Sequence, residues 1–280
     1  MLLITGSNGQ LGFELKRIYS EQYAIFSTQE NLPTAHLEKL SLFFEQNTIT
    51  AIINCAAYTQ VDKAESDQEN CYALNDRAVE NLSQMSAKYQ IPLIHISTDY
   101  VFNGKNYIPY KEVDETNPSS VYGLSKKSGE DKFLQYAFSG CIIRTSWLYS
   151  SHGKNFVKTM MNLGSTKESI SVVCDQVGTP TYAYDLACAI KKILPQIQKN
   201  EKEIYHFSNK GVASWYDFAY EIMKLKKLQC KITPIETKDY PTPATRPHYS
   251  VLAKNKIKNR FGIEVRHWRE GLEECLQKIS

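Results

Sequence analysis

Three residues in the first half of the chain have the side chains and the spacing to deliver a proton to the oxygen of a carbonyl that accepts hydride. Thr98 follows an apolar run at 92–97, and Tyr122 and Lys126 lie four positions apart, on one face of a predicted helix. A phenol has an ordinary pKa of about 10, and a nearby ammonium can lower it. The pattern therefore predicts a reductase with Thr98, Tyr122 and Lys126 as its catalytic residues.

The Tyr-x-x-x-Lys spacing occurs three times, so the choice among the copies needs an argument. The copy at 107–111 encloses a proline, which disfavours a regular helix, and the copy at 220–224 follows no strand that ends in Ser or Thr. Only Tyr122 and Lys126 open a good helical stretch after such a strand end. The alternative for this copy is a pair on an exposed helix surface.

A glycine-rich turn follows the first apolar strand. Its spacing, Gly-x-x-Gly-x-x-Gly, differs from the common Gly-x-Gly-x-x-Gly, but the strand before it and the amphipathic segment after it are the context of a dinucleotide site. The first two glycines would let the backbone approach a pyrophosphate, the third would let the helix pack on the sheet, and free N–H groups at the helix start favour negative charge. A plain turn is the alternative. The cofactor residues predicted here are Gly6, Asn8, Gly9, Gln10, Leu11 and Gly12.

Alternating strands and helices predict an α/β fold with a Rossmann-type, doubly wound parallel sheet. The pattern changes after residue 147. We therefore expect an NAD(P)-binding domain at 1–147 and a mainly substrate-binding region at 148–280, with some of its segments returning to the first domain. The smaller region should close over the strand ends and form a cleft. Predicted strands cover 2–5, 22–27, 51–55, 92–97, 141–145, 169–173 and 204–207, and predicted helices cover 10–20, 36–46, 67–90, 120–138, 182–199, 214–227 and 267–279.

Other residues are candidates for this cleft. Ala56 and Ala57 follow the third predicted strand and would let a cofactor pass over its end, although a buried turn of small residues is the alternative. Arg246 lies in a proline-rich loop, where its guanidinium could pair with a phosphate. Arg144 lies inside an apolar strand, where a phosphate contact and a structural salt bridge are equally good interpretations.

Composition argues against several classes of protein. The net charge of +3, from 33 Lys and Arg against 30 Asp and Glu, gives no sign of a nucleic-acid partner. No apolar run approaches the roughly 20 residues that cross a membrane, and a strand rather than a signal peptide opens the chain. Seven scattered cysteines without Cys-x-x-Cys spacing indicate reduced thiols in a cytoplasmic protein. His95 and His206 are interpreted as core residues, and no metal ligand is predicted.

Over nearly its full length the chain resembles the extended short-chain dehydrogenases/reductases and, within them, the dTDP-4-dehydrorhamnose reductase family. The later matching segments separate this family from nucleotide-sugar epimerases and dehydratases. The segments are GQLG at 9–12, NCAAYTQVDKAE at 54–65, STDYVF at 97–102, YGLSK at 122–126, RTSW at 144–147, NFVKTM at 155–160, DQVGTPT at 175–181 and YPTPATRP at 240–247.

The resemblance implies a reaction, the reduction of the 4-keto group of dTDP-4-dehydro-β-L-rhamnose to dTDP-β-L-rhamnose, which is the last step of dTDP-L-rhamnose biosynthesis. It implies that Thr98 binds the keto oxygen, that Tyr122 gives it a proton, and that Lys126 holds the nicotinamide ribose. It also implies a substrate role for Asp99, Tyr100, Trp147 and Arg246, and a cofactor role for Ala56, Ala57 and Tyr58.

The cofactor, the metal and the oligomer stay open. The second strand ends in FSTQE at 26–30, with no clear Asp for an NAD ribose and no Arg for a 2′-phosphate, so NADPH is favoured with NADH accepted. Members of the family have been linked to Mg²⁺ held by glutamates at a subunit interface, and Glu14 matches one such position, so Mg²⁺ and a homodimer are both left open. Alternatives to the reductase are a related nucleotide-sugar reductase or epimerase on another sugar, and a non-catalytic regulatory subunit.

Overall fold

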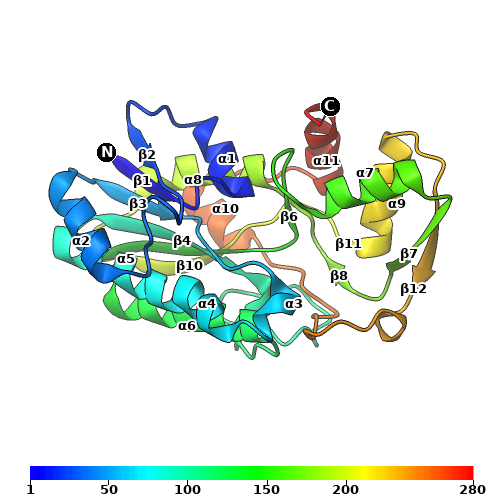
Figure 1. Ribbon diagram of the computed structural model, residues 1–280, viewed down its shortest axis with the longest axis horizontal. Coiled ribbons are helices and arrows are strands. Elements are labelled where there is room, and N and C mark those ends of the chain that lie inside the picture. Colours follow the sequence, from blue (N-terminus) through cyan, green and yellow to red (C-terminus); the bar gives the residue numbers. More distant parts are fainter. Residues whose placement is uncertain (280) are drawn as a thin grey trace.

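A six-stranded parallel sheet forms the centre of the molecule in the computed structural model, which describes residues 1–279 (Figure 1). The strands lie in the order β10-β5-β4-β3-β1-β2. The chain moves from β1 outward to β2 and then returns to β3 on the other side of β1. This reversal is the topological switch point beside which ligands bind in doubly wound sheets. The strands are β1 (Leu2–Thr5), β2 (Ala24–Phe26), β3 (Ala51–Asn54), β4 (Pro92–Thr98), β5 (Ser139–Thr145) and β10 (Lys202–His206).

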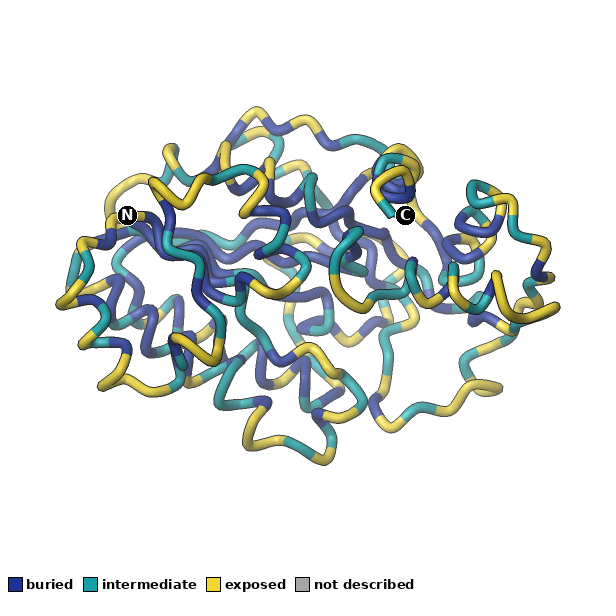
Figure 2. The backbone as a smooth tube through the Cα atoms, turned by 45° about the horizontal axis from the view of Figure 1, so that its top comes forward, coloured by how far each residue is buried: buried dark blue, intermediate teal, exposed yellow. Residues whose placement is uncertain are grey.

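Helices cover both faces of this sheet, and the inner strands β1, β3 and β5 are correspondingly buried along their length (Figure 2). Side chains alternate between the faces, so Leu3 and Ile52 pack under one layer of helices while Ile4 and Ile53 pack under the other. The Rossmann-type fold is thus confirmed. The first layer holds α2 (Leu37–Gln46), α5 (Ala78–Tyr89) and α6 (Val121–Tyr136), and the second holds α1 (Gln10–Lys16), α8 (Ala183–Ile193) and α10 (Asn255–Phe261).

Three predicted elements differ from the structure. The single helix expected at 67–90 is divided into α4 (Gln68–Tyr72), a π-helical turn η1 (Ala73–Arg77) and α5. The helix expected at 10–20 ends at Lys16. The helix expected at 182–199 is α8 (Ala183–Ile193) followed by the 3₁₀ turn η3 (Leu194–Gln196). The strand expected at 204–207 is found as β10, which joins the central sheet beside β5, as expected of a later segment that returns to the first domain.

The second half of the chain also builds its own core, in which Phe218 and Trp268 are buried. This part lies beyond the carboxyl ends of the central strands (Figure 1). The boundary after residue 147 stays a prediction. The main elements are α7 (Phe156–Thr166), β7 (Ser169–Val173), α9 (Trp215–Leu225), β12 (Lys231–Ile235) and α11 (Trp268–Gln277), and the short ones are α3 (Val61–Ala64), η2 (Asp99–Val101), β6 (Leu148–Tyr149), β8 (Val177–Gly178), β9 (Thr181–Tyr182), η3 (Leu194–Gln196), β11 (Ala213–Ser214) and η4 (Thr237–Asp239).

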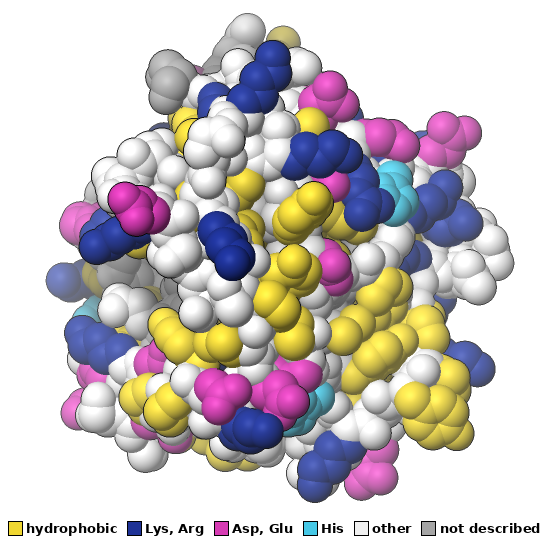
Figure 3. Space-filling model, turned by 90° about the vertical axis from the view of Figure 1, so that its right-hand side faces the viewer, with side chains coloured by type: hydrophobic (Ala, Val, Ile, Leu, Met, Phe, Trp, Pro, Cys, Tyr) yellow, Lys and Arg dark blue, Asp and Glu magenta, His cyan; other side chains and the backbone are white. Residues whose placement is uncertain are grey.

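The surface carries both signs of charge. On the face that the second half presents in Figure 3, Lys and Arg side chains are interspersed with Asp and Glu. Across residues 1–279, no helix combines the length and the apolar character needed to cross a membrane. All seven cysteines are free thiols.

Candidate active site

The turns after β1 and β3 touch each other at the switch point of the sheet. Gly6 has a φ of +63°, and a Cβ on it would lie 2.6 Å from the backbone nitrogen of Ala56. A side chain is therefore excluded there by the neighbouring turn, and not directly by a ligand. This contact brings the predicted cofactor residues of the two turns together.

The glycine turn has features that suit a bound phosphate. Gly9 is the N-cap of α1. Because glycine has no side chain to accept a hydrogen bond, no side-chain cap binds the backbone N–H groups at the start of the helix. A Cβ on Gly9 would meet one atom of the rest of the protein within 4 Å, the Gly6 carbonyl oxygen at 3.2 Å. The buried hydroxyl of Ser7 has no hydrogen-bond partner among residues 1–279. A polar ligand would satisfy these groups.

The other residues of the turn also make contacts within the protein. A Cβ on Gly12 would lie 2.4 Å from the carbonyl oxygen of Gly6, so Gly12 lets α1 approach the turn that directly follows β1. Leu11 is buried in the core. The side chain of Gln10 contacts the carbonyl oxygen of Leu148 and Asn155, and the backbone oxygen of Asn8 contacts His152, so both residues link the turn to the segment after β5.

The loop after β3 is held by Asn75, which the π-helical turn η1 displaces toward it. Asn75 accepts from the Tyr58 backbone N–H at 2.9 Å and donates to the Tyr58 carbonyl at 3.1 Å and to the Ser125 hydroxyl at 3.0 Å. The Tyr58 hydroxyl donates to Asp67 at 2.9 Å. The loop with Ala56 and Ala57 is thus fixed against α6, and the π-turn is a local irregularity typical of functional sites.

Helix α6 carries Tyr122 to the carboxyl end of β4. Ser120 caps the helix by accepting from the Gly123 N–H at 3.1 Å. A Cβ on Gly123 would lie 2.4 Å from the Tyr100 carbonyl oxygen, so only glycine allows this close approach of α6 to the turn after β4. As a result the ring of Tyr122 packs edge-on against Tyr100, with 5.4 Å between the ring centres.

Thr98 lies near Tyr122 at the carboxyl end of β4, and the catalytic roles of both residues stay a prediction. Burial raises the pKa of the Tyr122 phenol, and the neighbouring Thr98 hydroxyl partly offsets that rise. The Thr98 hydroxyl also donates to Asp99 at 3.0 Å and accepts from the Tyr100 N–H at 3.2 Å. Burial raises the pKa of Asp99 to about 7, and one of its carboxylate oxygens has no partner within the described part of the chain.

Lys126 takes a different direction from the one expected. Its amine donates to the Ile96 carbonyl at 2.7 Å and lies 3.3 Å from Nε2 of His95. In this arrangement the amine is held by the Ile96 carbonyl and His95, and its lowering of the Tyr122 pKa stays a prediction. Burial lowers the pKa of Lys126 itself to about 8.

Trp147 lies in a strained backbone conformation next to the site. Its φ is +48°, which is unusual for a bulky side chain and costs about 1–3 kcal/mol. Its ring stacks on Trp215 from α9, with 3.6 Å between ring centres and 7° between planes. The stack joins the end of β5 to the second half of the chain. Trp215 was not predicted from the sequence.

Arg144 is a structural residue. Its guanidinium donates to both carboxylate oxygens of Glu130, at 2.8 and 2.7 Å, and both side chains are at most 2% exposed. The structure therefore decides between the two interpretations of Arg144 in favour of the salt bridge. Glu130 was missed because nothing in its helix pattern marks it as buried.

Arg246 also meets a carboxylate. It makes a two-pronged ion pair with Asp62, at 2.8 and 2.7 Å, and the Ala244 N–H donates to the same carboxylate at 3.3 Å. The hydrogen bond from Arg246 lowers the pKa of Asp62. This pair ties the proline-rich loop to α3.

Glu14 does not suit a magnesium ion. Its carboxylate is buried and is occupied by Arg17 at 2.5 Å and by the Ser150 hydroxyl at 2.6 Å. Within residues 1–279 no group of three or more His, Cys, Asp or Glu side chains is arranged to hold a metal ion. We derive no chemical step from Mg²⁺.

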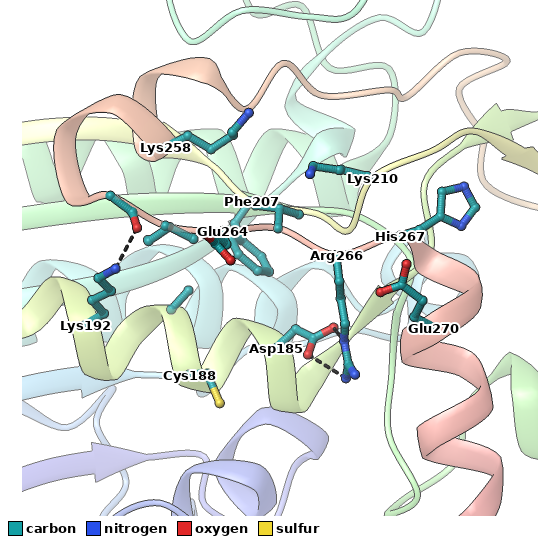
Figure 4. Close-up of a pocket in the computed structure, with 14 residues that line it drawn as sticks. Asp185, Cys188, Lys192, Phe207, Lys210, Lys258, Glu264, Arg266, His267 and Glu270 are labelled. Atoms are coloured by element: carbon teal, nitrogen blue, oxygen red, sulfur yellow. Dashed lines mark hydrogen bonds and ion pairs between the residues drawn. The ribbon is translucent and has the colours of Figure 1, made fainter.

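A cavity of about 850 Å³ lies elsewhere, between α8, α10 and the start of α11 (Figure 4). Its polar lining is partly paired within the protein, since Arg266 binds Asp185 and Lys192 donates to the Gly262 carbonyl. None of the predicted site residues lines it.

The sheet, the glycine turn at its switch point and the Thr98–Tyr122 pair define the protein as an extended short-chain dehydrogenase/reductase. The family model for the RmlD substrate binding domain matches residues 1–280, and the chain belongs to that family.

Its relatives match it over their full length. It is 39% identical to the spore coat polysaccharide biosynthesis protein SpsK of Bacillus subtilis, over 100% of this chain and 98% of that protein. A crystal structure of a dTDP-4-dehydrorhamnose reductase from Clostridium acetobutylicum is 40% identical, with a TM-score of 0.94 over 99% of this chain and 98% of the other. The dTDP-4-dehydrorhamnose reductase of Bacillus anthracis, solved in complex with NADP, is 35% identical with a TM-score of 0.94 and the same coverage.

Proposed function

We propose that this protein reduces the 4-keto group of dTDP-4-dehydro-β-L-rhamnose to dTDP-β-L-rhamnose with NADPH. The observation that carries the proposal is the position of Tyr122, which is buried on α6 against Tyr100, the residue whose N–H donates to Thr98 at the end of β4, in a chain whose relatives are named for this reaction. A cytoplasmic location and a homodimer belong to the same proposal.

Thr98 and Tyr122 would have different roles at the keto oxygen of the substrate. Thr98 would turn its hydroxyl from Asp99 to the keto oxygen, and Tyr122 would give that oxygen its proton. Burial keeps the phenol protonated, so Tyr122 holds the proton that the oxygen receives. The nicotinamide, when bound, supplies the hydride. Tyr100 and Trp147 flank the same strand ends and would contact the sugar.

The residues at the glycine turn would hold the cofactor. The N–H groups at the start of α1 and the Ser7 hydroxyl suit the pyrophosphate. At the end of β2, where an Asp would hold an NAD ribose, the chain has Ser27 and Thr28. The amine of Lys16 lies 5.5 Å from the ring centre of Phe26 at that end. A cation there supports the choice of NADPH, with NADH accepted.

A panel of sugars tests the reaction. Purified protein should oxidise NADPH in the presence of dTDP-4-dehydro-β-L-rhamnose, and the UDP-linked 4-keto sugars should be poorer substrates. Faster turnover of another nucleotide sugar would move the assignment to a related reductase. No turnover of any 4-keto sugar would contradict the enzyme proposal and favour a regulatory subunit.

Replacing Arg246 tests recognition of the nucleotide. In the proposed function Arg246 exchanges Asp62 for the diphosphate of the substrate. Arg246→Ala should therefore raise KM for the dTDP-sugar by about 10- to 150-fold, which corresponds to the roughly 1.5–3 kcal/mol of a charge-assisted hydrogen bond. The KM for NADPH should change little, as steady-state kinetics with each substrate varied in turn will measure.

Asp62→Asn is the matched control, because it breaks the ion pair but keeps the guanidinium. If Arg246 binds phosphate, this variant should leave KM for the sugar unchanged or lower it. If the two variants raise that KM equally, the arginine only holds the loop and its assignment to the substrate fails.

A further inference from the structure

A line of buried polar side chains runs beneath the site, from the glycine turn to Lys126. The hydroxyl of Thr5 donates to Oδ1 of Asn54 at 2.6 Å, and Nδ2 of Asn54 lies 3.1 Å from Nδ1 of His95. Nε2 of His95 then lies 3.3 Å from the amine of Lys126. The sheet itself sets this order, since Thr5 pairs with Asn54 and Asn54 with His95 across neighbouring strands. All four side chains are buried.

The backbone fixes the direction of these hydrogen bonds. The N–H of Ala56 is shared between Oδ1 of Asn54 at 3.2 Å and the Thr5 hydroxyl at 3.4 Å, and the shorter of these bonds assigns the amide oxygen of Asn54 to that N–H and its NH₂ group to His95. Nδ1 of His95 must then accept. Burial lowers the pKa of His95 well below its ordinary value, and a positive charge on Lys126 would lower it further, so the ring is neutral in either state of the lysine and carries its one proton on Nε2.

That proton points at the amine of Lys126. A neutral lysine amine has a lone pair that can accept this proton in a hydrogen bond. A lysine ammonium has only N–H donors, so it would place a donor against the Nε2–H of His95. The uncharged amine can still donate to the Ile96 carbonyl.

We propose that His95 is a positioning residue for Lys126, whose uncharged amine it holds at the end of β4 by donating its Nε2–H. The proposal rests on the proposed function, in which Lys126 holds the nicotinamide ribose and acts with Tyr122.

Other charged and titratable groups around the amine act in the opposite sense. Glu130 on the same helix, Cys71 on α4 and Cys55 after β3 each favour the charged form of Lys126. Glu130 is itself bound to Arg144, and burial raises the pKa of both thiols. Burial of Lys126 outweighs these three groups, and the N–H of His95 acts in the same direction as burial.

His95→Asn tests the proposal. Asparagine keeps an acceptor near the Nδ1 position for Asn54 and removes the group that faces Lys126. If the protonated lysine is the active form, kcat/KM should fall as pH rises through the pKa of Lys126. Loss of the His95 N–H raises the pKa of Lys126. The fall of kcat/KM, which is the falling limb of its pH profile, should therefore occur about one pH unit higher in His95→Asn. An unmoved limb in the folded variant would overturn the proposal.

His206→Asn is the matched control. His206 is also fully buried in the central sheet, where Nδ1 lies 3.1 Å from the Tyr110 carbonyl, and it does not contact Lys126. Its replacement should leave the limb in place. If both variants move the limb equally, His95 acts only through general loosening of the sheet and the proposal fails.

The protonated nitrogen of His95 can also be identified in the unmutated protein, by an experiment that requires no enzyme activity and no folded variant. Two-bond ¹H–¹⁵N correlation spectra of ¹⁵N-histidine-labelled protein should show His95 protonated on Nε2 at high pH, and its ring nitrogens should respond as Lys126 titrates. A proton on Nδ1 at high pH would refute the inference. If no sugar is turned over but the Nε2–H form is found, the proposed function fails while the docking of Lys126 stands.

Discussion

Tyr122→Phe is expected to lower kcat by about 10²–10⁴-fold, the usual effect of removing a positioned general acid. The phenyl ring keeps the edge-on packing against Tyr100, so the fold and the affinity for NADPH should change little. Thr98 would still bind the keto oxygen, and the hydride could still transfer, but no group would be placed to protonate the oxygen. Stopped-flow and steady-state oxidation of NADPH will measure the loss.

The two other copies of the spacing supply the controls. Tyr107 is 87% exposed in a loop and Tyr220 is 56% exposed on α9. Their replacement by phenylalanine should leave kcat within a few-fold of the unmutated protein. Full activity of Tyr122→Phe together with loss of activity in either control would mean that the catalytic tyrosine was misassigned.

The sheet was predictable because its strands are buried on both faces and stand out as short apolar runs between amphipathic helices. The position of β10 in the sheet was not predictable from the sequence. The residues at 202–206 have the pattern of any short strand, and only the tertiary packing of α8 and α10 on the same face places this strand next to β5. The π-turn at Ala73–Arg77 was also invisible, since the helical periodicity of 67–90 continues through it and only the hydrogen bonds of Asn75 reveal the displacement.

Within the site, sequence spacing predicted that Thr98 and Tyr122 lie near each other, because both residues lie at element ends that a parallel sheet brings to one edge. It could not give partners that come from distant segments. Asp62 lies 184 residues before Arg246, and a motif shows neither that they meet nor how. Lys126 was placed on the face of Tyr122 by helical spacing, but the length of its side chain lets the amine reach the Ile96 carbonyl and His95 instead. His95 was taken as a plain core residue because its neighbours in the sequence are apolar.

Glu130→Gln is expected to lower the free energy of unfolding by about 3–5 kcal/mol, because it leaves the guanidinium of Arg144 buried without a compensating charge. One nitrogen of that guanidinium already has no hydrogen-bond partner among residues 1–279, and Glu130 accepts the hydrogen bonds of the other two. Urea unfolding followed by fluorescence and circular dichroism will measure the change, with an unaltered m-value showing that the unfolding reaction itself is the same.

Two further variants separate the loss of this ion pair from a general effect of losing a glutamate. Glu80 on α5 binds Lys132 on α6 at 3.1 Å with both side chains partly exposed, and Glu80→Gln should cost less than about 1 kcal/mol. Replacing Glu130 and Arg144 together by methionine should cost less than Glu130→Gln alone, since no unpaired charge then remains in the core. A Glu130→Gln variant no less stable than Glu80→Gln would mean that water reaches Arg144, and the pair would not join α6 to the sheet as its geometry indicates.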